Sequence, residues 1–295
     1  MKSGIINTGV SLIDRDYHND HNNVSILSIR IAPDGFSYAI FDTLRNKYTV
    51  LESFDLQGVS NESIWIDTIG VLLEEKKINP KSFIQAIIQS DFPGALPVPE
   101  ALYHHDNKEL LFKYNLQKSK EQTLLQDNIG NLGIVMLHPL SLKIKSHISS
   151  FFASETIIHQ QSSLLSVLYN TSVSDLSGVQ VFVQINRNAF ECIIFNNKKL
   201  LFFNSFQYKS AEDLLYFLLY VMKQHNLDPE KQKVVLMGNL TRSSAIASKA
   251  AKYIRFVHFI NKNPQDDFSV AFEAVEDHQF FNLLNLKNCG LSAEH

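Results

Sequence analysis

Two groups of histidine and acidic residues have the kinds of side chain that ligate metal ions. His104-His105-Asp106 are consecutive, and Asp16, His18 and Asp20 alternate in a polar segment with His21 beside them. Imidazole and carboxylate groups are common zinc ligands, but neighbouring side chains of an extended segment point in opposite directions. A solvated turn explains the first group and a flexible, solvated N-terminal segment explains the second. The sequence therefore assigns no metal site.

Serine and cysteine residues are the other candidates for chemistry, as nucleophiles. They are Ser162-Ser163, Cys192 and Cys289. A nucleophile needs a neighbouring base or a lowered pKa, and no recognisable base motif accompanies these residues. Two isolated cysteines are also too few for a disulfide framework or a cysteine-based zinc site. Neither of the common glycine-rich phosphate-binding patterns occurs, so the sequence assigns no catalytic residue.

The elements that would position such residues occur twice in the chain. Residues 27–90 and 181–239 show the same order of apolar and polar segments. Each copy starts with an alternating apolar strand and a turn, Pro33-Asp34-Gly35 or Asn186-Arg187-Asn188, which predicts a β-hairpin. Four residues coincide at one constant offset: Ile31 with Ile185, Phe36 with Phe190, Ile40 with Ile194 and Phe41 with Phe195. The chain is therefore predicted to contain an internal duplication.

After the hairpin, each copy continues with a third strand, a helix and a fourth strand. The third strands are predicted at 48–54 and 200–206, the helices from Ser60-Asn61-Glu62-Ser63 and Ser210-Ala211-Glu212-Asp213, and the fourth strands at 83–89 and 233–237. A hydroxyl before an acidic first turn is a typical helix start, and Asx-Pro follows each helix. Because both helices are unusually apolar, we expect them to be buried on more than one side.

Residues 92–131 have no counterpart in the second copy and are predicted to form a small inserted subdomain. In it, residues 109–115 resemble a strand and residues 118–129 a helix. The first half then resumes with strand 133–137, helix 140–152, strand 156–159 and helix 162–169, and the second half with helix 241–253 and strand 254–260. An alternative alignment pairs residues 135–159 with 236–258. The predicted organisation is a polar segment at 1–23, a first domain at 24–170 and a second at 171–295.

Composition excludes several classes of protein. The net charge of −3 and the pI near 6.4 provide no basic surface for a phosphate backbone, so we expect no nucleic-acid partner. Met1–Asn23 lacks the apolar core of a signal peptide, and the longest apolar run, Leu214–Met222, is shorter than the ~20 residues of a membrane span. A cytoplasmic protein without direct membrane insertion is expected.

The order of elements resembles the superfamily of actin, sugar kinases and heat-shock chaperones. The insertion lies where the bacterial actin-like proteins of cell division and type IV pilus assembly have theirs. More specifically, the chain resembles an uncharacterised bacterial family with the actin-like ATPase fold, through Leu27–Arg30, Asp34–Ser37, Val98–Tyr103, His278-Gln279-Phe280 and Cys289. The resemblance implies an α/β protein with duplicated ribonuclease-H-like domains, each with a mixed sheet flanked by helices.

The same resemblance implies where a nucleotide would bind. Active members have an acid near the end of the first strand of each domain, where this chain has Arg30 and Gln184. Arginine cannot bind a metal ion, and neither residue can act as a general base. The remaining candidates for a nucleotide cleft are Asp34, Gly35, Ser37, Asn186, Asn188, Gly238 and Asn239. Asp34–Ser37 resembles a shifted phosphate-binding hairpin, but Pro-Asp-Gly and Asn-rich turns also form hairpins without a ligand.

These observations favour a non-catalytic or very weakly catalytic actin-like binding or scaffold protein, a pseudo-ATPase. Its partner is expected to be a protein or peptide, bound between the domains or beside the inserted subdomain, and no cofactor is expected. The alternative is a divergent nucleotide-binding ATPase or small-molecule kinase that uses the interdomain cleft, ATP and magnesium, with Asp34 in place of the first acid. The sequence leaves the partner's identity and the oligomeric state open.

Overall fold

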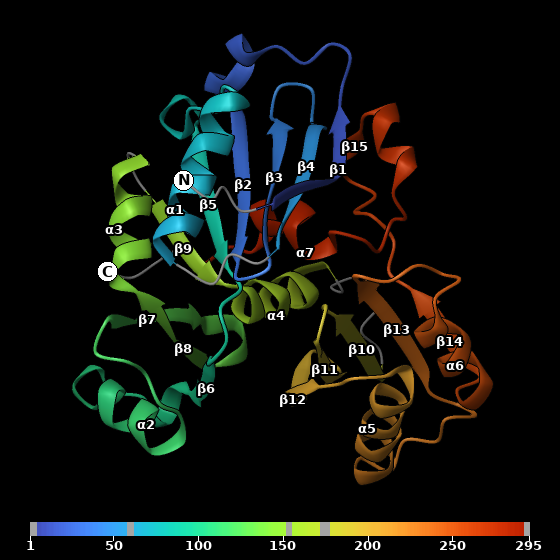
Figure 1. The fold of residues 1–295 in the computed structure, drawn as a ribbon. Coiled ribbons are helices and arrows are strands. Elements are labelled where there is room, and N and C mark those ends of the chain that lie inside the picture. Colours follow the sequence, from blue (N-terminus) through green and yellow to red (C-terminus); the bar gives the residue numbers. More distant parts are fainter. Residues whose placement is uncertain (1–4, 58–61, 152–154, 172–177, 292–295) are drawn as a thin grey trace. The chain divides into compact units, whose positions relative to one another are not determined.

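The computed structural model describes residues 5–57, 62–151, 155–171 and 178–291 of the chain (Figure 1). The chain forms two compact units. The first contains Met1–Leu168, Gln265–Ala274 and Leu283–His295, and the second contains Tyr169–Pro264 and Val275–Asn282. The first unit thus includes two C-terminal segments, Gln265–Ala274 and Leu283–His295, whereas the sequence predicted that all of residues 171–295 belong to the second domain.

The first unit is built on one large mixed sheet. Its strands are β1 (Ile5–Ile13), β2 (Ser25–Ala32), β3 (Gly35–Asp42), β4 (Lys47–Gln57), β5 (Gln85–Ser90) and β9 (Glu155–His159), in the order β1-β4-β3-β2-β5-β9. The short β15 (Asp267–Phe268) also pairs with β4. Strands β2, β3 and β4 are antiparallel neighbours, whereas β5 and β9 run parallel to β2. This arrangement is the predicted three-stranded unit followed by crossover strands.

The second unit repeats the same strand order. Its sheet contains β10 (Val179–Ile185), β11 (Ala189–Asn196), β12 (Lys199–Gln207), β13 (Lys233–Gly238) and β14 (Phe256–Phe259), in the order β12-β11-β10-β13-β14. Strand for strand, this order matches β4-β3-β2-β5-β9 of the first unit. The predicted duplication and mixed α/β class are therefore confirmed. The two alignments differ at β13, which corresponds by its place in the sheet to β5, as in the first alignment, and not to residues 135–137 of β8 (Ile134–Ser141). Strand β14 corresponds to β9 in both alignments.

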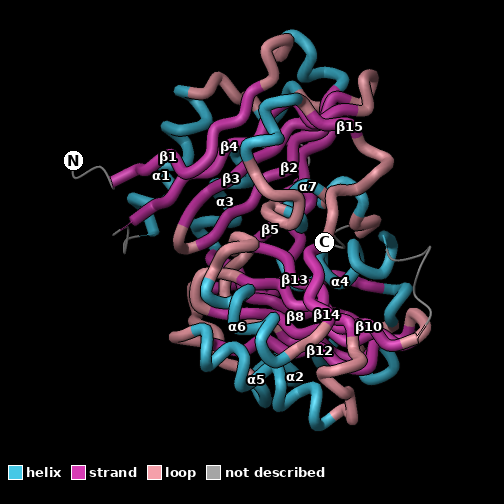
Figure 2. The backbone as a smooth tube through the Cα atoms, turned by 90° about the vertical axis from the view of Figure 1, so that its right-hand side faces the viewer, coloured by secondary structure: helices cyan, strands magenta, loops and turns pink. Residues whose placement is uncertain are grey.

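Helices cover these sheets (Figures 1 and 2). In the first unit, α1 (Glu62–Glu75) and α3 (Leu142–Phe151) share a core with β2, β3 and β5, and in the second, α5 (Ala211–Gln224) and α6 (Ala245–Tyr253) pack beside β10–β13. The Ser210 hydroxyl accepts from the amide of Asp213, as predicted for a helix cap. The cap predicted at Ser60-Asn61 lies outside the described residues.

Both apolar helices are buried on more than one side, as expected, although each keeps an exposed strip. Helix α1 packs on the sheet and on α3 but exposes Ile64 and Val71. Helix α5 packs on the sheet and on α6 but exposes Tyr216 and Tyr220. Such exposed apolar residues can take part in binding when they are contiguous. Within the described ranges, every helix is too short or too polar to span a bilayer.

The inserted subdomain differs from its sequence prediction. It forms a three-stranded sheet in the order β6-β8-β7, with β6 at Leu96–Pro99, β7 at Gln122–Ile129 and β8 at Ile134–Ser141. Residues 109–115, expected as a strand, lie in helix α2 (Lys108–Asn115), which buries only Phe112. Residues 122–129, expected as part of a helix, form β7 because they pair with β8 along their length. The subdomain therefore extends to Ser141, ten residues beyond its predicted end at 131.

The N-terminal segment also differs from expectation. Residues 5–13, expected to be part of a flexible polar segment, form β1, which pairs with β4 along the edge of the sheet. Ser11, Leu12 and Ile13 pair with Glu52, Leu51 and Val50. Alternating polar and apolar residues are compatible with an edge strand that buries one face.

A buried carboxylate fastens β1 to the rest of this sheet. Glu52 on β4 is only 1% exposed, and it accepts hydrogen bonds from Tyr38 Oη, from Ser11 Oγ at 2.7 Å and from Lys76 Nζ at 2.6 Å. Charge-assisted hydrogen bonds of this kind are stronger than neutral ones. Glu52 thereby joins three strands and the segment that follows α1.

We expect Glu52→Gln to lower the free energy of unfolding by about 2 kcal/mol, because the amide keeps the volume but loses the charge and one acceptor oxygen. Urea unfolding at pH 7 measures this loss. Glu75→Gln is the matched control, since Glu75 is exposed on α1, and it should change stability by less than about 0.5 kcal/mol. Equal effects of the two substitutions would contradict the assignment of Glu52 as the fastening residue.

Candidate functional site

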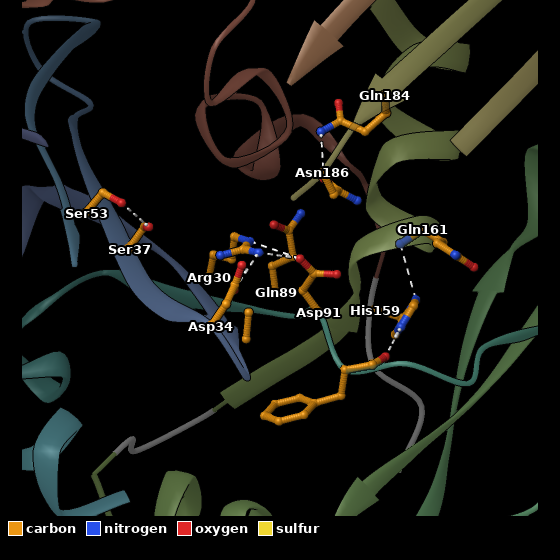
Figure 3. Close-up of polar contacts among 12 residues, drawn as sticks. Arg30, Asp34, Ser37, Ser53, Gln89, Asp91, His159, Gln161, Gln184 and Asn186 are labelled. Atoms are coloured by element: carbon orange, nitrogen blue, oxygen red, sulfur yellow. Dashed lines mark hydrogen bonds and ion pairs between the residues drawn. The ribbon is translucent and has the colours of Figure 1, made fainter. Parts of the chain in front are cut away.

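A row of polar side chains crosses the sheet of the first unit. Ser53, Ser37, Arg30 and Gln89 are cross-strand neighbours on β4, β3, β2 and β5 (Figure 3). Residues of β2 alternate between faces, so Arg30 points away from the face on which Ile29 and Ile31 join the core with α1 and α3. The Ser37 hydroxyl donates to Ser53 Oγ at 3.0 Å, and the Gln89 amide donates to Ser163 Oγ at 2.7 Å.

Two carboxylates hold Arg30, which lies between Ser37 and Gln89 in this row. Its Nε and Nη2 donate to Asp91 Oδ2 at 3.1 and 2.5 Å, and Nη2 lies 3.4 Å from Asp34 Oδ1 (Figure 3). Asp91 directly follows β5, and Asp34 lies in the β2–β3 hairpin. Both partners are therefore positioned by the backbone of the duplicated unit.

The charges of this cluster sum to −1. Burial alone would lower the pKa of Arg30, but the charges of Asp91 and Asp34 raise it above its ordinary value. Burial raises the pKa of Asp91, and the attraction of Arg30 opposes that change. The guanidinium cannot ligate a metal ion or accept a proton, and its nearest partners are already anions. A phosphate group at this place would meet two carboxylates.

Gly35 has a packing role in the hairpin. A Cβ atom at this position would lie 2.6 Å from the carbonyl oxygen of Phe54 on the neighbouring strand. Only glycine allows so close an approach of two backbones. The close contact between β3 and β4 therefore accounts for Gly35 without a ligand.

The second unit has the equivalent row with different chemistry. Ser205, Glu191, Gln184 and Met237 are the cross-strand neighbours on β12, β11, β10 and β13. Glu191 is buried and accepts from Asn186 Nδ2 at 3.0 Å, while Asn186 Oδ1 accepts from Gln184 Nε2 at 3.3 Å. The Asn186 side chain thus bridges Gln184 and Glu191. Asn188 is exposed in the hairpin, and its carbonyl accepts from the amide of Tyr208.

The turn after β13 is occupied by a later segment of the same unit. Gly238 N donates to the carbonyl of His278 at 2.9 Å, and Asn239 N donates to the carbonyl of Ile185 at 2.7 Å. The carbonyl of Leu240 accepts from Gln279 Nε2 at 3.1 Å and lies 2.9 Å from His278 Nε2. A Cβ atom at Gly238 would lie 2.3 Å from the carbonyl oxygen of Ile185. Close strand packing therefore accounts for this glycine also.

The histidine and acid groups of the sequence do not form a metal centre in the described part of the chain. No group of three or more His, Cys, Asp or Glu side chains there could hold a metal ion. His104, His105 and Asp106 lie on an exposed single turn before α2. The amide of Asp16 donates to Asp14 Oδ1, and the side chains of Asp20 and His21 lie outside the described part.

A second buried polar cluster lies between the inserted subdomain and the main sheet. Asp127 on β7 is 1% exposed, accepts from the amide of His159 at 2.8 Å and lies 3.3 Å from His138 Nε2. His159 Nδ1 accepts from the amide of Gln161 at 3.2 Å, so Nε2 carries the proton and donates to the carbonyl of Phe92 at 2.9 Å (Figure 3). Burial lowers the pKa of His159 to about 4.

Sequence reasoning missed three parts of these sites: Asp91, Glu191 and the segment at residues 276–279. Glu191 could have been found, because the constant offset of the repeat aligns it with Ser37. Asp91 directly follows the fourth strand and precedes the predicted insertion, and no role was predicted for it from the sequence. Nothing in the local sequence indicates that residues 276–279 bind the turn after β13.

Comparison with known proteins identifies the family of this chain. The family model described as "Protein of unknown function (DUF3822)" matches residues 14–257. The chain belongs to the DUF3822 family. None of the curated proteins matches it.

The fold of this DUF3822 protein is also found in solved structures. A Bacteroides thetaiotaomicron protein with an actin-like ATPase fold and unknown function is 20% identical, with a TM-score of 0.71 over 88% of this chain and 97% of the other. The PilM–PilN type IV pilus biogenesis complex contains a chain that is 11% identical, with a TM-score of 0.61 over 90% of this chain and 98% of the other. The fold is therefore that of the actin-like ATPases, as the sequence predicted.

Proposed function

We propose that this DUF3822 protein is an actin-like protein that acts by binding a protein or peptide partner and does not hydrolyse ATP efficiently. The observation that carries the proposal is the ion-paired Arg30. Where an active member of the superfamily has an acid, this chain has a guanidinium bound to Asp91 at 2.5 Å and lying 3.4 Å from Asp34.

The electrostatics oppose both parts of Mg-ATP. A magnesium ion needs oxygen ligands, and Arg30 supplies a cation at the central position. The triphosphate needs positive charge or free amides, but the cluster of one arginine and two aspartates has a net charge of −1. Asp34 could take up a catalytic role only by releasing Arg30, which would leave Asp91 with the same cation. Phosphoryl transfer relies on positioning and charge stabilisation, and this cluster supplies neither.

The second unit supports the same proposal. At the place where a nucleoside would lie against backbone, Gly238 N and the carbonyl of Leu240 are bonded to residues 278–279. Gln184 and Asn186 are bonded to each other, and Asn186 to Glu191. Each group would have to exchange an internal hydrogen bond for one to the ligand, which reduces the net gain on binding.

A role in binding a protein is supported by the likeness to the PilM–PilN complex, a structure in which an actin-like fold occurs together with a second protein. Folds of this kind host many functions, so the likeness suggests a class of role and not a particular partner. A protein or peptide fits the proposal because binding of this type needs surface complementarity and no catalytic group.

The proposal is tested by phosphate release from Mg-ATP by the full chain. We expect no release above that of the buffer, and the same result for Asp34→Ala. Turnover by the wild-type chain that Asp34→Ala abolishes would overturn the proposal and favour the divergent ATPase. Asp106→Ala, an exposed acid on the turn before α2, is the matched control for the loss of one carboxylate.

A further inference from the structure

The outer edge of β12 is an unpaired strand edge in the second unit. Strand β12 ends the sheet order, and no described strand pairs with its outer side. The amide of Tyr208 donates to the carbonyl of Asn188, and β12 pairs with β11 in antiparallel register. Backbone hydrogen-bonding groups alternate in direction along such a pair. The N–H and C=O groups of Asn204 and Phe206 therefore point toward β11, whereas those of Phe203, Ser205 and Gln207 point outward.

The middle of this edge is blocked by one side chain. The Ser205 amide, which faces outward, donates to Asn204 Oδ1 at 2.9 Å. Asn204 and Ser205 are both exposed. An unpaired edge is a template for another strand, and proteins commonly protect it. The Asn204 side chain protects this edge reversibly, because the carbonyl oxygen of an incoming strand can replace Asn204 Oδ1 as the acceptor of the Ser205 amide.

Aromatic side chains continue from this edge onto the surface of α5. The Phe206 ring stacks on Phe217 at 5.3 Å, Phe217 contacts Tyr216 at 5.5 Å, and Tyr216 stacks on Tyr220 at 6.4 Å between ring centroids. Tyr216 is 64% exposed and Tyr220 is 51% exposed. Phe217, Tyr216 and Tyr220, which we call the aromatic surface, are thus contiguous with the core side of β12. Exposed tyrosines are frequent anchors of binding interfaces.

The positive charges at the two ends of β12 indicate what kind of segment the edge can bind. Lys198 and Lys199 lie at one end of β12 and Lys209 lies beyond the other, all three are exposed, and residues 198–209 contain no acid. In an antiparallel pair with a second copy, the lysines at opposite ends would meet, and like charges opposite each other are destabilising. A segment with acidic residues at both ends would instead be attracted at both.

We propose that the outer edge of β12 binds an extended peptide segment of a partner protein that has acidic residues at both ends. The segment adds as a further strand, with its backbone bonded to Phe203, Ser205 and Gln207 and alternate apolar side chains on the aromatic surface. This proposal rests on the proposed binding function and names its site and the chemistry of the partner.

The test is selection of a displayed library of random 12-residue peptides on the full chain, followed by titration of the recovered peptides as synthetic probes. We expect sequences with acids near both ends and apolar residues at alternate positions. Ser205→Pro removes an outward amide and keeps the backbone hydrogen bonds to β11, although it also removes the contact of the Ser205 hydroxyl with Glu191 Oε1 at 3.5 Å. It should weaken binding about ten-fold or more. Lys199→Glu should weaken binding about five-fold, more so at low salt.

Asn204→Ala should strengthen binding about three-fold, because the outward amide no longer has an internal acceptor to lose. Tyr253→Ser and Lys252→Glu are the matched controls, since both residues are exposed on α6, which packs beside β14 at the opposite end of the sheet. They should leave binding unchanged.

Tyr216→Ser leaves the sheet intact and should also weaken binding, which keeps the test valid if the proline variant fails to fold. Failure to recover peptides, or peptides that bind the Tyr216→Ser and Lys199→Glu variants as tightly as the wild type, would overturn the edge proposal. Phosphate release from Mg-ATP, measured on the same sample, separates the two proposals. Peptide binding together with ATP turnover would overturn only the non-catalytic function, and absence of both would overturn only the edge.

Discussion

Gly238→Ala is expected to lower the free energy of unfolding by about 4 kcal/mol. The φ angle of Gly238 is +98°, which side chains other than glycine rarely adopt, and the new Cβ would lie 2.3 Å from the carbonyl oxygen of Ile185 and 2.7 Å from Gln184 Nε2. The strained backbone contributes about 1–2 kcal/mol and the overlap with a buried strand about 2–3 kcal/mol. Chemical unfolding of the purified variant, followed by circular dichroism, measures the loss.

Gly130→Ala is the matched control. A Cβ atom there would meet only Asn128 Oδ1 at 3.8 Å, so we expect a change below about 0.5 kcal/mol. The comparison bears on function, because a large loss of stability without ligand shows that the fold itself requires a glycine at position 238. A Gly238→Ala variant as stable as the wild type would contradict the packing role of this residue.

Mild acid is expected to destabilise the protein through His159. The pKa of this group is about 4 in the folded protein, below the ordinary 6.5, because burial disfavours the charged ring. A histidine whose folded pKa is lowered contributes stability that is fully present above the unfolded pKa and is lost as pH falls toward the folded one. The loss should reach about 2 kcal/mol at pH 5 and about 3 kcal/mol at pH 4.

Urea unfolding of the wild type and His159→Gln between pH 7.5 and 4 measures this contribution. Burial also lowers the pKa values of His147 and His278, so the wild-type curve contains more than one histidine. The difference between the two curves isolates His159, since glutamine does not titrate. We expect that difference to change by about 2 kcal/mol between pH 7 and pH 5. Parallel curves would contradict a neutral His159 in the folded protein.

The fold could be predicted because the repeat places two copies of one pattern in the same register. Alternating apolar residues, hairpin turns and helix caps are local, and both copies agree on them. The inserted subdomain could not be predicted in the same way. Its strand β7 is polar and is fixed as a strand by pairing with β8, so a tertiary contact overrides the local preference.

In the candidate site, too, local features could be predicted from the sequence and contacts between distant segments could not. Sequence identified Arg30 and Gln184 as departures from the expected acids, since those positions follow from the strand register. It did not identify Asp91, which meets Arg30 across 61 residues of chain. Ion pairs between distant segments depend on side-chain directions that only the folded protein defines.

The central claim is that the duplicated fold is retained while its nucleotide chemistry is not. Calorimetric titration of the full chain with ATP and ADP in the presence of magnesium tests it most directly. We expect no saturable heat up to millimolar nucleotide, for the wild type and for Asp34→Ala alike, because Arg30, Asp91 and the turn after β13 are already bonded internally. Micromolar binding of ATP by the wild type that Asp34→Ala abolishes would contradict the account.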